Sequence, residues 1–249
     1  MKIWRLIVVT LLVIVGFSGP APSRAAAHPD VIQKVINLMP PAPYASQMSS
    51  AERSEILHLY YHGPKVRLTF DDCATQVRLT GLLDWLRHYN VQAIFFFTGQ
   101  CMLAHPTYRT QITRAGQLLG NHSFDHRDYS RMTANQIYTE VRRYGSVIPT
   151  TSPKLCRPPY GAGAFNLSVY NALARAGCRP AYWTVDTRDW DGSSAGTIIR
   201  RVQFGDSTTP RVRAGGVILM HGTGPHTLQA LPGVRNALIY WRLSTFHIR

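Results

Sequence analysis

From residue 65 onward, short apolar runs alternate with longer stretches that are apolar on one side only. Short apolar runs predict buried strands, and longer stretches with apolar residues three or four positions apart predict amphipathic helices. The expected strands are 66–70, 93–98, 117–120, 155–157, 181–185 and 216–220. The expected helices are 76–89, 107–115, 134–144, 167–176, 195–202 and 227–240. Strands that alternate with helices predict an α/β fold built on a parallel sheet or barrel.

The N-terminal segment has a different pattern. Lys2 and Arg5 precede an apolar run over 6–17, and the small residues at 25–27 offer a cleavage site. This order predicts a signal peptide over 1–27. An uncleaved N-terminal anchor is the alternative, although a run of about 12 residues is shorter than the roughly 20 that span a bilayer.

Residues 28–62 are rich in Pro, Ala and Ser, with one short apolar-periodic stretch at 31–38, and predict an arm or linker. The folded domain is therefore expected over 63–249. The chain is 45% hydrophobic and only 16% charged, so it has enough apolar material for a core. This composition excludes an intrinsically disordered protein.

The chain is strongly basic, with 27 Lys and Arg against 13 Asp and Glu and a formal charge of +14. Loss of residues 1–27 removes three basic residues and no acid, which leaves 24 against 13, or +11. Such a charge attracts polyanions, and those outside the membrane are wall polymers, acidic polysaccharides and lipid head groups. The basic residues are scattered, which is also typical of an ordinary solvated surface. We expect a secreted or envelope-associated monomer, attracted to an anionic cell envelope, with no nucleic-acid partner.

Polar residues follow five of the expected strands at the point where each ends. They are Asp71, Asp72, His122, Arg157, Tyr160, Asp186, Asp189 and His221. Because the carboxyl ends of parallel strands open onto one face, we expect these side chains to lie close together.

His122 and His126 have the spacing of a metal-binding pair. On one helical turn, imidazoles four residues apart face the same way and can bind one ion. The zinc-protease motif is excluded, because Ser123 stands where that motif has a Glu base. The spacing also occurs by chance in many helices, so the pair needs a third ligand.

Asp71 and Asp72 are adjacent, and two neighbouring carboxylates raise each other's pKa unless one is neutralised. A cation bound to Asp72 would solve this and leave Asp71 as a base paired with Arg157. The alternative is that the two carboxylates cap the helix that follows.

These residues resemble the five ordered motifs of the polysaccharide deacetylases (NodB homology, carbohydrate esterase family 4). The matching segments are Thr69-Phe70-Asp71-Asp72, His122-Ser123-x-x-His126, Arg157-Pro158-Pro159-Tyr160-Gly161, Asp186-x-x-Asp189-Trp190 and Leu219-Met220-His221. The resemblance covers about residues 62–249. It implies a distorted (β/α)7-type barrel, similar to a TIM barrel with fewer strands.

The resemblance also implies a divalent metal, most often Zn2+, held by Asp72, His122 and His126. It makes Asp71 the general base and Arg157 the partner that holds its carboxylate.

On the leaving-group side, the resemblance makes His221 the general acid, oriented by Asp189. The backbone N–H of Tyr160 would stabilise the oxyanion, and Trp190 and Leu219 would wall the pocket for the acetyl methyl group. Two roles are open for Asp186: its side chain could reach His221, or the residue could simply end its strand.

Four cysteines in an exported chain permit two disulfides, and their spacing leaves three connectivities open. Buried free thiols are the alternative. Placed in the barrel that the resemblance implies, Cys73 and Cys101 follow adjacent strands at the same end, and Cys156 and Cys178 flank the next strand–helix–strand unit. The resemblance thus implies the pairs Cys73–Cys101 and Cys156–Cys178.

The chain departs from the family pattern at four places. Cys73-Ala74 follows the Asp pair where Gly is usual, Arg127 stands where Pro is common, and Gly222 stands where Asp is common. Residues 203–215 are longer than the usual connection and are expected to form a loop at the rim of the cleft. These departures affect substrate choice more than the proposed chemistry.

The expected function is a secreted, metal-dependent hydrolase that removes acetyl groups from an N-acetylglucosamine-containing polysaccharide, such as peptidoglycan or a chitin-like polymer. One alternative is an O-acetyl esterase on xylan-like polymers. Another is a non-catalytic carbohydrate-binding or wall-binding protein, which would be expected to have lost Asp71, His126 or His221.

Overall fold

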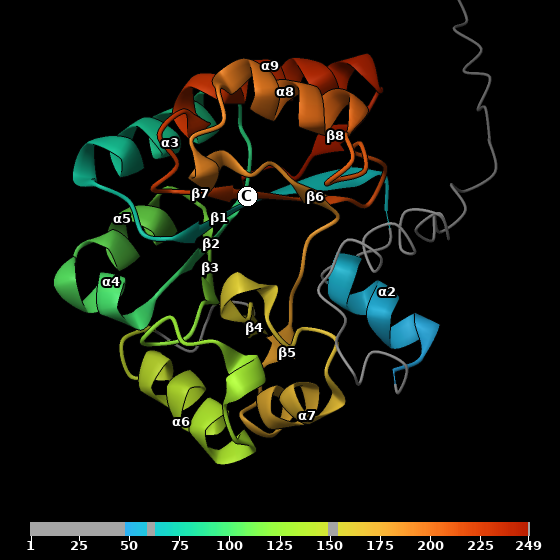
Figure 1. The fold of residues 1–249 in the computed structure, drawn as a ribbon. Coiled ribbons are helices and arrows are strands. Elements are labelled where there is room, and N and C mark those ends of the chain that lie inside the picture. Colours follow the sequence, from blue (N-terminus) through green and yellow to red (C-terminus); the bar gives the residue numbers. More distant parts are fainter. Residues whose placement is uncertain (1–47, 59–62, 149–153, 249) are drawn as a thin grey trace, which may run out of the picture.

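A computed structural model describes residues 48–58, 63–148 and 154–248 (Figure 1). The predicted signal peptide and the apolar stretch at 31–38 lie outside the described residues. Within the described ranges, no helix combines the length and apolar character that a membrane crossing requires.

A parallel sheet forms the centre of the molecule (Figure 1). Its strands are β1 (Lys65–Asp72), β2 (Ile94–Phe97), β3 (Leu118–Asn121), β4 (Leu155–Cys156), β5 (Arg179–Pro180), β6 (Val185–Asp186) and β7 (Val217–His221). Their order is β5-β4-β3-β2-β1-β7-β6, and a short β8 (Ser244–Thr245) pairs with the start of β1. With its helices, the sheet confirms the predicted α/β class and the distorted (β/α)7-type barrel.

Helices surround the sheet. They are α2 (Ser50–His58), α3 (Gln76–His88), α4 (Gly99–Ala104), α5 (Tyr108–Arg114), α6 (Ala134–Gly145), α7 (Leu167–Arg175), α8 (Ala195–Phe204) and α9 (Thr227–Tyr240). Thr75 caps α3 by accepting a hydrogen bond from the backbone N–H of Arg78, so the Asp pair does not cap this helix. The short helix α4 was not predicted, because its six residues are too few to show a helical period.

The core lies between the sheet and its helices. β2 is buried along its whole length, and the rings of Phe70 and Phe95 stack 5.1 Å apart across the β1–β2 pair. β2 is apolar on both faces, as expected for a strand at the centre of a sheet covered by helices. β1 is apolar on one face only, through Val66, Leu68 and Phe70.

The expected strand 181–185 was wrong, because the chain changes partners within it. β5 pairs with β4, β6 pairs with β7, and residues 181–184 belong to neither strand. Ala181 donates its backbone N–H to Cys156 on one side of this gap, and Thr184 donates its backbone N–H to Val217 on the other. β5 and β6 are therefore the two edges of the sheet, joined by a bridging segment, 181–184.

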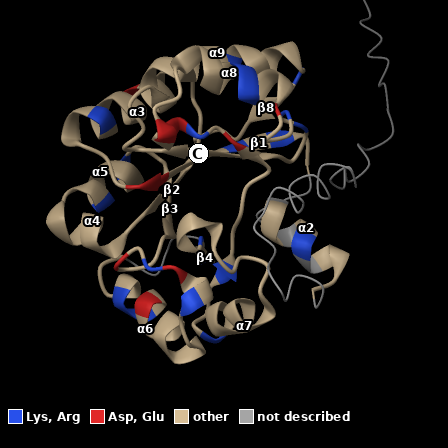
Figure 2. Ribbon diagram, viewed as in Figure 1, with Lys and Arg blue, Asp and Glu red and all other residues tan. Residues whose placement is uncertain are grey.

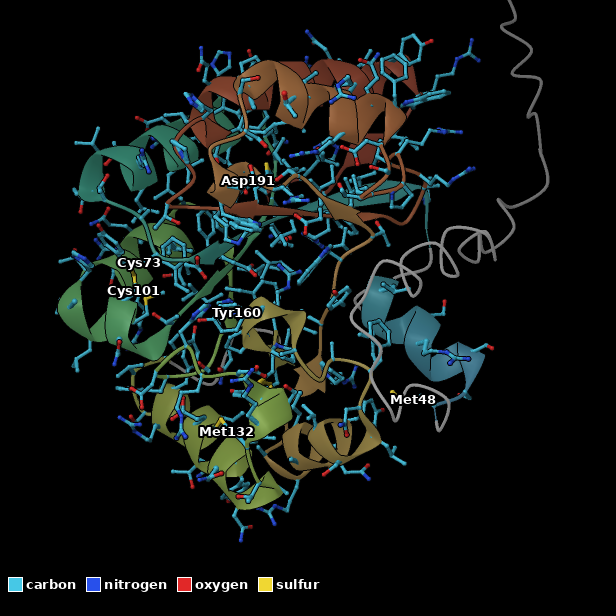
Figure 3. The ribbon with its side chains drawn as sticks, viewed as in Figure 1. Met48, Cys73, Cys101, Met132, Tyr160 and Asp191 are labelled. Atoms are coloured by element: carbon cyan, nitrogen blue, oxygen red, sulfur yellow. A yellow bond between two sulfur atoms is a disulfide. The ribbon has the colours of Figure 1, made fainter. Side chains whose placement is uncertain are left out.

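Helix α2 lies within the region that was predicted to be an arm or linker, and it packs on the barrel. It stands beside the bridging segment, with Met48 next to it (Figures 1 and 3). Met48, Ile56 and Leu57 are buried against Phe165 and Tyr182. At least part of the arm is therefore joined to the domain by an apolar contact.

Both disulfides join the predicted pairs. Cys73, after β1, is bonded to Cys101 in α4, and the two lie side by side in Figure 3. Cys156 in β4 is bonded to Cys178, which precedes β5. Each bond adjoins a predicted site residue, since Cys73 follows Asp72 and Cys156 precedes Arg157.

The loop 203–215 lies against the free edge of β6. Thr209 accepts the backbone N–H of Asp186, and Asp206 forms an ion pair with Arg201 at 2.9 Å. The loop thus satisfies an edge-strand donor that would otherwise be unpaired.

Candidate metal and catalytic site

Three predicted metal ligands meet at the carboxyl ends of β1 and β3. The Oδ1 atom of Asp72 lies 3.3 Å from Nε2 of His122 and 3.1 Å from Nε2 of His126. One ligand atom from each residue falls within 4.8 Å of the other two, and no other group of this kind occurs in the described residues. The strand order places these side chains together although 50 residues separate them in the sequence.

The hydrogen bonds of His122 fix which ring nitrogen faces Asp72. Its Nδ1 lies 2.8 Å from the carbonyl oxygen of Arg157, an atom that only accepts, so Nδ1 carries the proton. In the neutral ring, Nε2 is then an acceptor that faces a carboxylate oxygen. Acceptors that converge in this way are satisfied by a cation, and two imidazoles with one carboxylate suit a divalent transition metal such as Zn2+.

His122 and His126 do not share a helical turn, so that part of the prediction was wrong. The segment between them is a loop in which Ser123 and His126 have positive φ angles of 64° and 57°. The buried Glu140 of α6 accepts the backbone N–H groups of Phe124 and Asp125. The loop, rather than a helix, turns both imidazoles toward Asp72.

Asp72 is held in its ionised form. Burial by itself would raise the pKa of its carboxyl, but the adjacent imidazoles of His122 and His126, with the charge of His221, outweigh burial and hold the pKa well below its usual range. An ionised carboxylate is the form that binds a cation.

Asp71 lies beside this group and is paired with Arg157. The carboxyl Oδ1 of Asp71 accepts a hydrogen bond from Nη1 of Arg157 at 2.6 Å, and both side chains are almost fully buried. The other oxygen, Oδ2, lies 3.7 Å from Nε2 of His122. Asp71 therefore presents one oxygen to the arginine and the other toward the candidate metal ligands.

His221, at the end of β7, is paired with Asp189. The imidazole Nδ1 lies 2.8 Å from Oδ1 of Asp189, and the backbone N–H of His221 donates to Oδ2. Burial alone would lower the pKa of His221, but the hydrogen bond and charge of Asp189, with the charges of Asp71 and Asp72, raise it to about 9. His221 is therefore protonated at neutral pH.

Asp186 does not share this pairing. Its side chain accepts the backbone N–H of Arg188, and burial raises the pKa of its carboxyl. The structure thus puts Asp189, and not Asp186, in hydrogen-bond contact with His221.

The three residues expected to line the substrate pocket differ in exposure. Leu219 is buried, whereas Tyr160 and Trp190 are 70% and 56% exposed. The Tyr160 hydroxyl lies 3.1 Å from Nδ1 of His126, a side-chain contact that was not predicted. Trp190 lies at the surface, and the Cζ atom of Arg188 is 5.7 Å from the centroid of the Trp190 ring.

Several supporting residues were missed by sequence reasoning. Thr69 accepts a hydrogen bond from Arg157 at 2.8 Å, the carbonyl of Tyr182 accepts another at 3.0 Å, and the hydroxyl of Thr227 donates to Asp189. Thr69 stands two positions before Asp71, which was a usable signal. Tyr182 lies 25 residues from Arg157, and Thr227 lies 38 residues from Asp189. No local sequence pattern predicts these contacts.

Backbone strain is concentrated at the site. Five of the seven non-glycine residues with positive φ in the described chain surround it: Asp72, Ser123, His126, Tyr160 and Arg188. Such angles are unfavourable for L-residues and persist where the surrounding structure enforces them, often at functional sites.

Comparisons with known proteins agree with this geometry. The family model described as polysaccharide deacetylase matches residues 60–181. A chitooligosaccharide deacetylase of Bradyrhizobium sp. is 30% identical over 164 residues, covering 64% of this chain and 71% of that protein. The peptidoglycan-N-acetylglucosamine deacetylase PgdA of Listeria monocytogenes is also 30% identical over 67% of this chain, but the match spans only about a third of that protein, 34%.

The fold is similar to that of a solved enzyme as well. A family 4 carbohydrate esterase from Streptomyces lividans, solved in complex with acetate, aligns with a TM-score of 0.66 and 31% identity. The alignment covers 75% of this chain and 93% of the other.

Proposed function

Because the chain belongs to the polysaccharide deacetylase family, we propose that it is a secreted, metal-dependent hydrolase that removes acetyl groups from a polysaccharide containing N-acetylglucosamine. The observation that supports this proposal best is the meeting of one candidate metal group with two separate charged pairs, Asp71–Arg157 and Asp189–His221. Hydrolysis of an amide needs a base for water and an acid for the leaving amine. The first pair presents a carboxylate oxygen toward the candidate ligands, and the second presents an imidazole that can donate a proton.

Asp72, His122 and His126 would hold the cation. When bound, a divalent cation acts as a Lewis acid toward the acetyl carbonyl and lowers the pKa of a water molecule.

Asp71 is the proposed base. Its Oδ1 is bonded to Arg157, and its other oxygen, Oδ2, faces the candidate ligands, where it can take a proton from the attacking water. Arg157 keeps the carboxylate in place through the 2.6 Å hydrogen bond. The backbone N–H of Tyr160 is the proposed donor to the oxyanion that forms on the acetyl oxygen.

His221 is the proposed acid. With its pKa raised to about 9, its imidazole holds a proton at neutral pH and can give it to the departing amine. Asp189 bonds Nδ1 and so leaves the Nε2 proton free for that transfer. Trp190 and Leu219 are the proposed walls for the acetyl methyl group.

The substrate proposal follows the relatives, whose names give peptidoglycan and chitooligosaccharides as substrates. The formal charge, +14 for the full chain and +11 without residues 1–27, suits work at an anionic envelope. Figure 2 shows Lys and Arg spread over several helices instead of gathered on one. We infer secretion from the predicted signal peptide and the two disulfides, and we expect the protein to act as a monomer.

The proposal is tested by acetate release from chitin oligomers, peptidoglycan and acetylated xylan, assayed side by side. The protein should release acetate from an N-acetylglucosamine substrate, lose this activity to a chelator and regain it with Zn2+. Asp72→Ala should be inactive and should bind Zn2+ weakly. Release that survives chelation or Asp72→Ala would contradict the mechanism, and binding of the polymers without release would favour the non-catalytic alternative.

A further inference from the structure

Arg157 is fully buried, and its position depends on few partners. Its side chain has no exposed surface and sits over the ring of Phe96, 4.1 Å from the centroid. Its Nη1 donates to Asp71 and Thr69, its Nη2 donates to the carbonyl of Tyr182, and its Nε has no partner among the described residues. A buried cation is held where its acceptors are, so a shift of the Tyr182 carbonyl would shift the guanidinium.

Tyr182 lies in the bridging segment, 181–184, where the sheet does not hold the chain. The backbone N–H of Tyr182 donates to the carbonyl of Ile56 in α2 at 3.0 Å. Buried backbone groups are nearly always paired, and the Ile56 carbonyl is the acceptor for this N–H. The bond joins α2 to the segment that carries an acceptor of Arg157.

Apolar contacts keep α2 in this position. Ile56 and Leu57 are fully buried, and they form one cluster with Met48, Phe165 and Tyr182. The rings of Phe165 and Tyr182 are 5.1 Å apart. Removal of these apolar side chains from water favours the docked position of the helix.

Helix α2 precedes the span that the family model matches, which begins at residue 60. We propose that α2 is a positioning element for the catalytic base: it holds Tyr182, Tyr182 holds Arg157, and Arg157 holds Asp71. This inference rests on the proposed function, because it takes Asp71 as the base. Among the candidate metal ligands, His122 contacts this series only at the backbone carbonyl of Arg157, and the Arg157 backbone N–H is itself held by Asn121 of β3. Displacement of α2 should therefore affect turnover much more than metal binding.

The test uses the full chain with the double variant Ile56→Ser and Leu57→Ser, which removes the apolar contacts of α2. Three measurements are made: hydrogen exchange at the Tyr182 amide, the steady-state kinetics of acetate release (kcat and KM), and Zn2+ affinity by competition with a chelator. We expect faster exchange at Tyr182 and a fall in kcat of about 10- to 100-fold, as for a slightly misplaced catalytic group. KM and Zn2+ affinity should stay within about twofold of the wild type, since α2 does not contact the ligands.

Two further variants serve as controls. Val77→Ser changes an exposed apolar residue of α3, 81% accessible, and should leave the Tyr182 exchange rate, the kinetics and the Zn2+ affinity unchanged. Leu57→Met preserves an apolar side chain of similar volume and should keep kcat close to that of the wild type. If the double variant does not fold, the single variant Leu57→Ala is measured in its place.

Either of two results would overturn the inference. One is an unchanged kcat in a variant whose Tyr182 amide exchanges faster. The other is a loss of Zn2+ affinity in proportion to kcat, which would indicate general loosening of the domain. A wild-type protein that releases no acetate would instead overturn the proposed function, and hydrogen exchange would still decide whether α2 holds Tyr182.

Discussion

At the scale of single residues, the proposed acid depends on the charge of its neighbour. The pKa of His221 is raised to about 9 chiefly because Asp189 bonds its imidazole, against an opposing effect of burial. The acid works only while it holds its proton. Activity should therefore be present below this pKa and should fall as the pH rises through it.

The variant Asp189→Asn keeps the shape of the pair and removes the charge. The pKa of His221 should fall, so the alkaline limb of the pH profile of kcat/KM should move to lower pH. A bound cation would shift wild type and variant alike, so the difference between the two profiles is the quantity to measure. An unmoved alkaline limb would show that a group other than His221 sets it.

A second residue-scale prediction concerns Asp71. The variant Asp71→Asn removes the base and keeps an oxygen for Arg157, so acetate release should fall by about 10²- to 10⁴-fold. Asp71 is not a candidate ligand, so Zn2+ content, measured by elemental analysis, should stay close to that of the wild type. Loss of the metal together with the activity would place Asp71 among the ligands instead.

The sequence predicts which charged residues come together at the strand ends, because each lies next to a strand end and within a motif. It could not predict how they are supported. The hydroxyl of Thr227 reaches Asp189 from a helix that starts 38 residues later. The Tyr160 hydroxyl reaches His126 from a residue that has a positive φ. Contacts of this kind follow from tertiary structure and leave no local pattern.

At the scale of elements, periodicity predicts most strands and helices and fails where an element is short or irregular. Helix α2 has two adjacent apolar residues, Ile56 and Leu57, in place of a helical repeat, so composition alone suggested a linker. The apolar run at 181–185 has the composition of a strand, but its backbone bonds to different partners at its two ends. Tertiary hydrogen bonds override local preference there.

The residues that directly follow β1 and β7, Cys73 and Gly222, lie very close together. A Cβ atom at this position would lie 2.2 Å from the carbonyl oxygen of Cys73, an atom of the backbone that cannot move aside alone. Gly222→Ala should therefore push the two strand ends apart, lower the melting temperature and reduce activity. As a control, Gly196→Ala has only a distant neighbour, 3.9 Å away, and should be tolerated.

The clash also bears on the family pattern, in which Asp is common at this position. The approach of Cys73 leaves no room for such a side chain here. If Gly222→Asp kept both the wild-type melting temperature and the activity, the close approach would not be a constraint on this position.

At the scale of the whole molecule, the two disulfides fasten the segments that carry the site. They close loops with sequence separations of 28 and 22 residues. Because each bond restricts the unfolded chain, each should stabilise the fold by about 3–4 kcal/mol. Reduction should therefore lower the unfolding free energy by several kcal/mol, as measured by urea denaturation with and without a thiol reductant.

Reduction should also lower activity, because Cys73 and Cys156 adjoin Asp72 and Arg157. The double variant Cys73→Ser and Cys101→Ser separates the two bonds, and it should lose Zn2+ affinity as well as stability. A reduced protein with unchanged stability would show that packing alone holds the strand ends.

Residues with a left-handed backbone conformation cluster around the site, and this clustering limits how the sequence can evolve. Asp72, Ser123, His126, Tyr160 and Arg188 each occupy a backbone conformation that costs an L-residue about 1 kcal/mol or more relative to the common regions. Selection for thermostability alone would therefore favour Gly or Asn at Tyr160 and Arg188, and would erode the proposed site while the fold improved. Selection that retains acetate release should keep these residues and gather its stabilising substitutions elsewhere in the molecule.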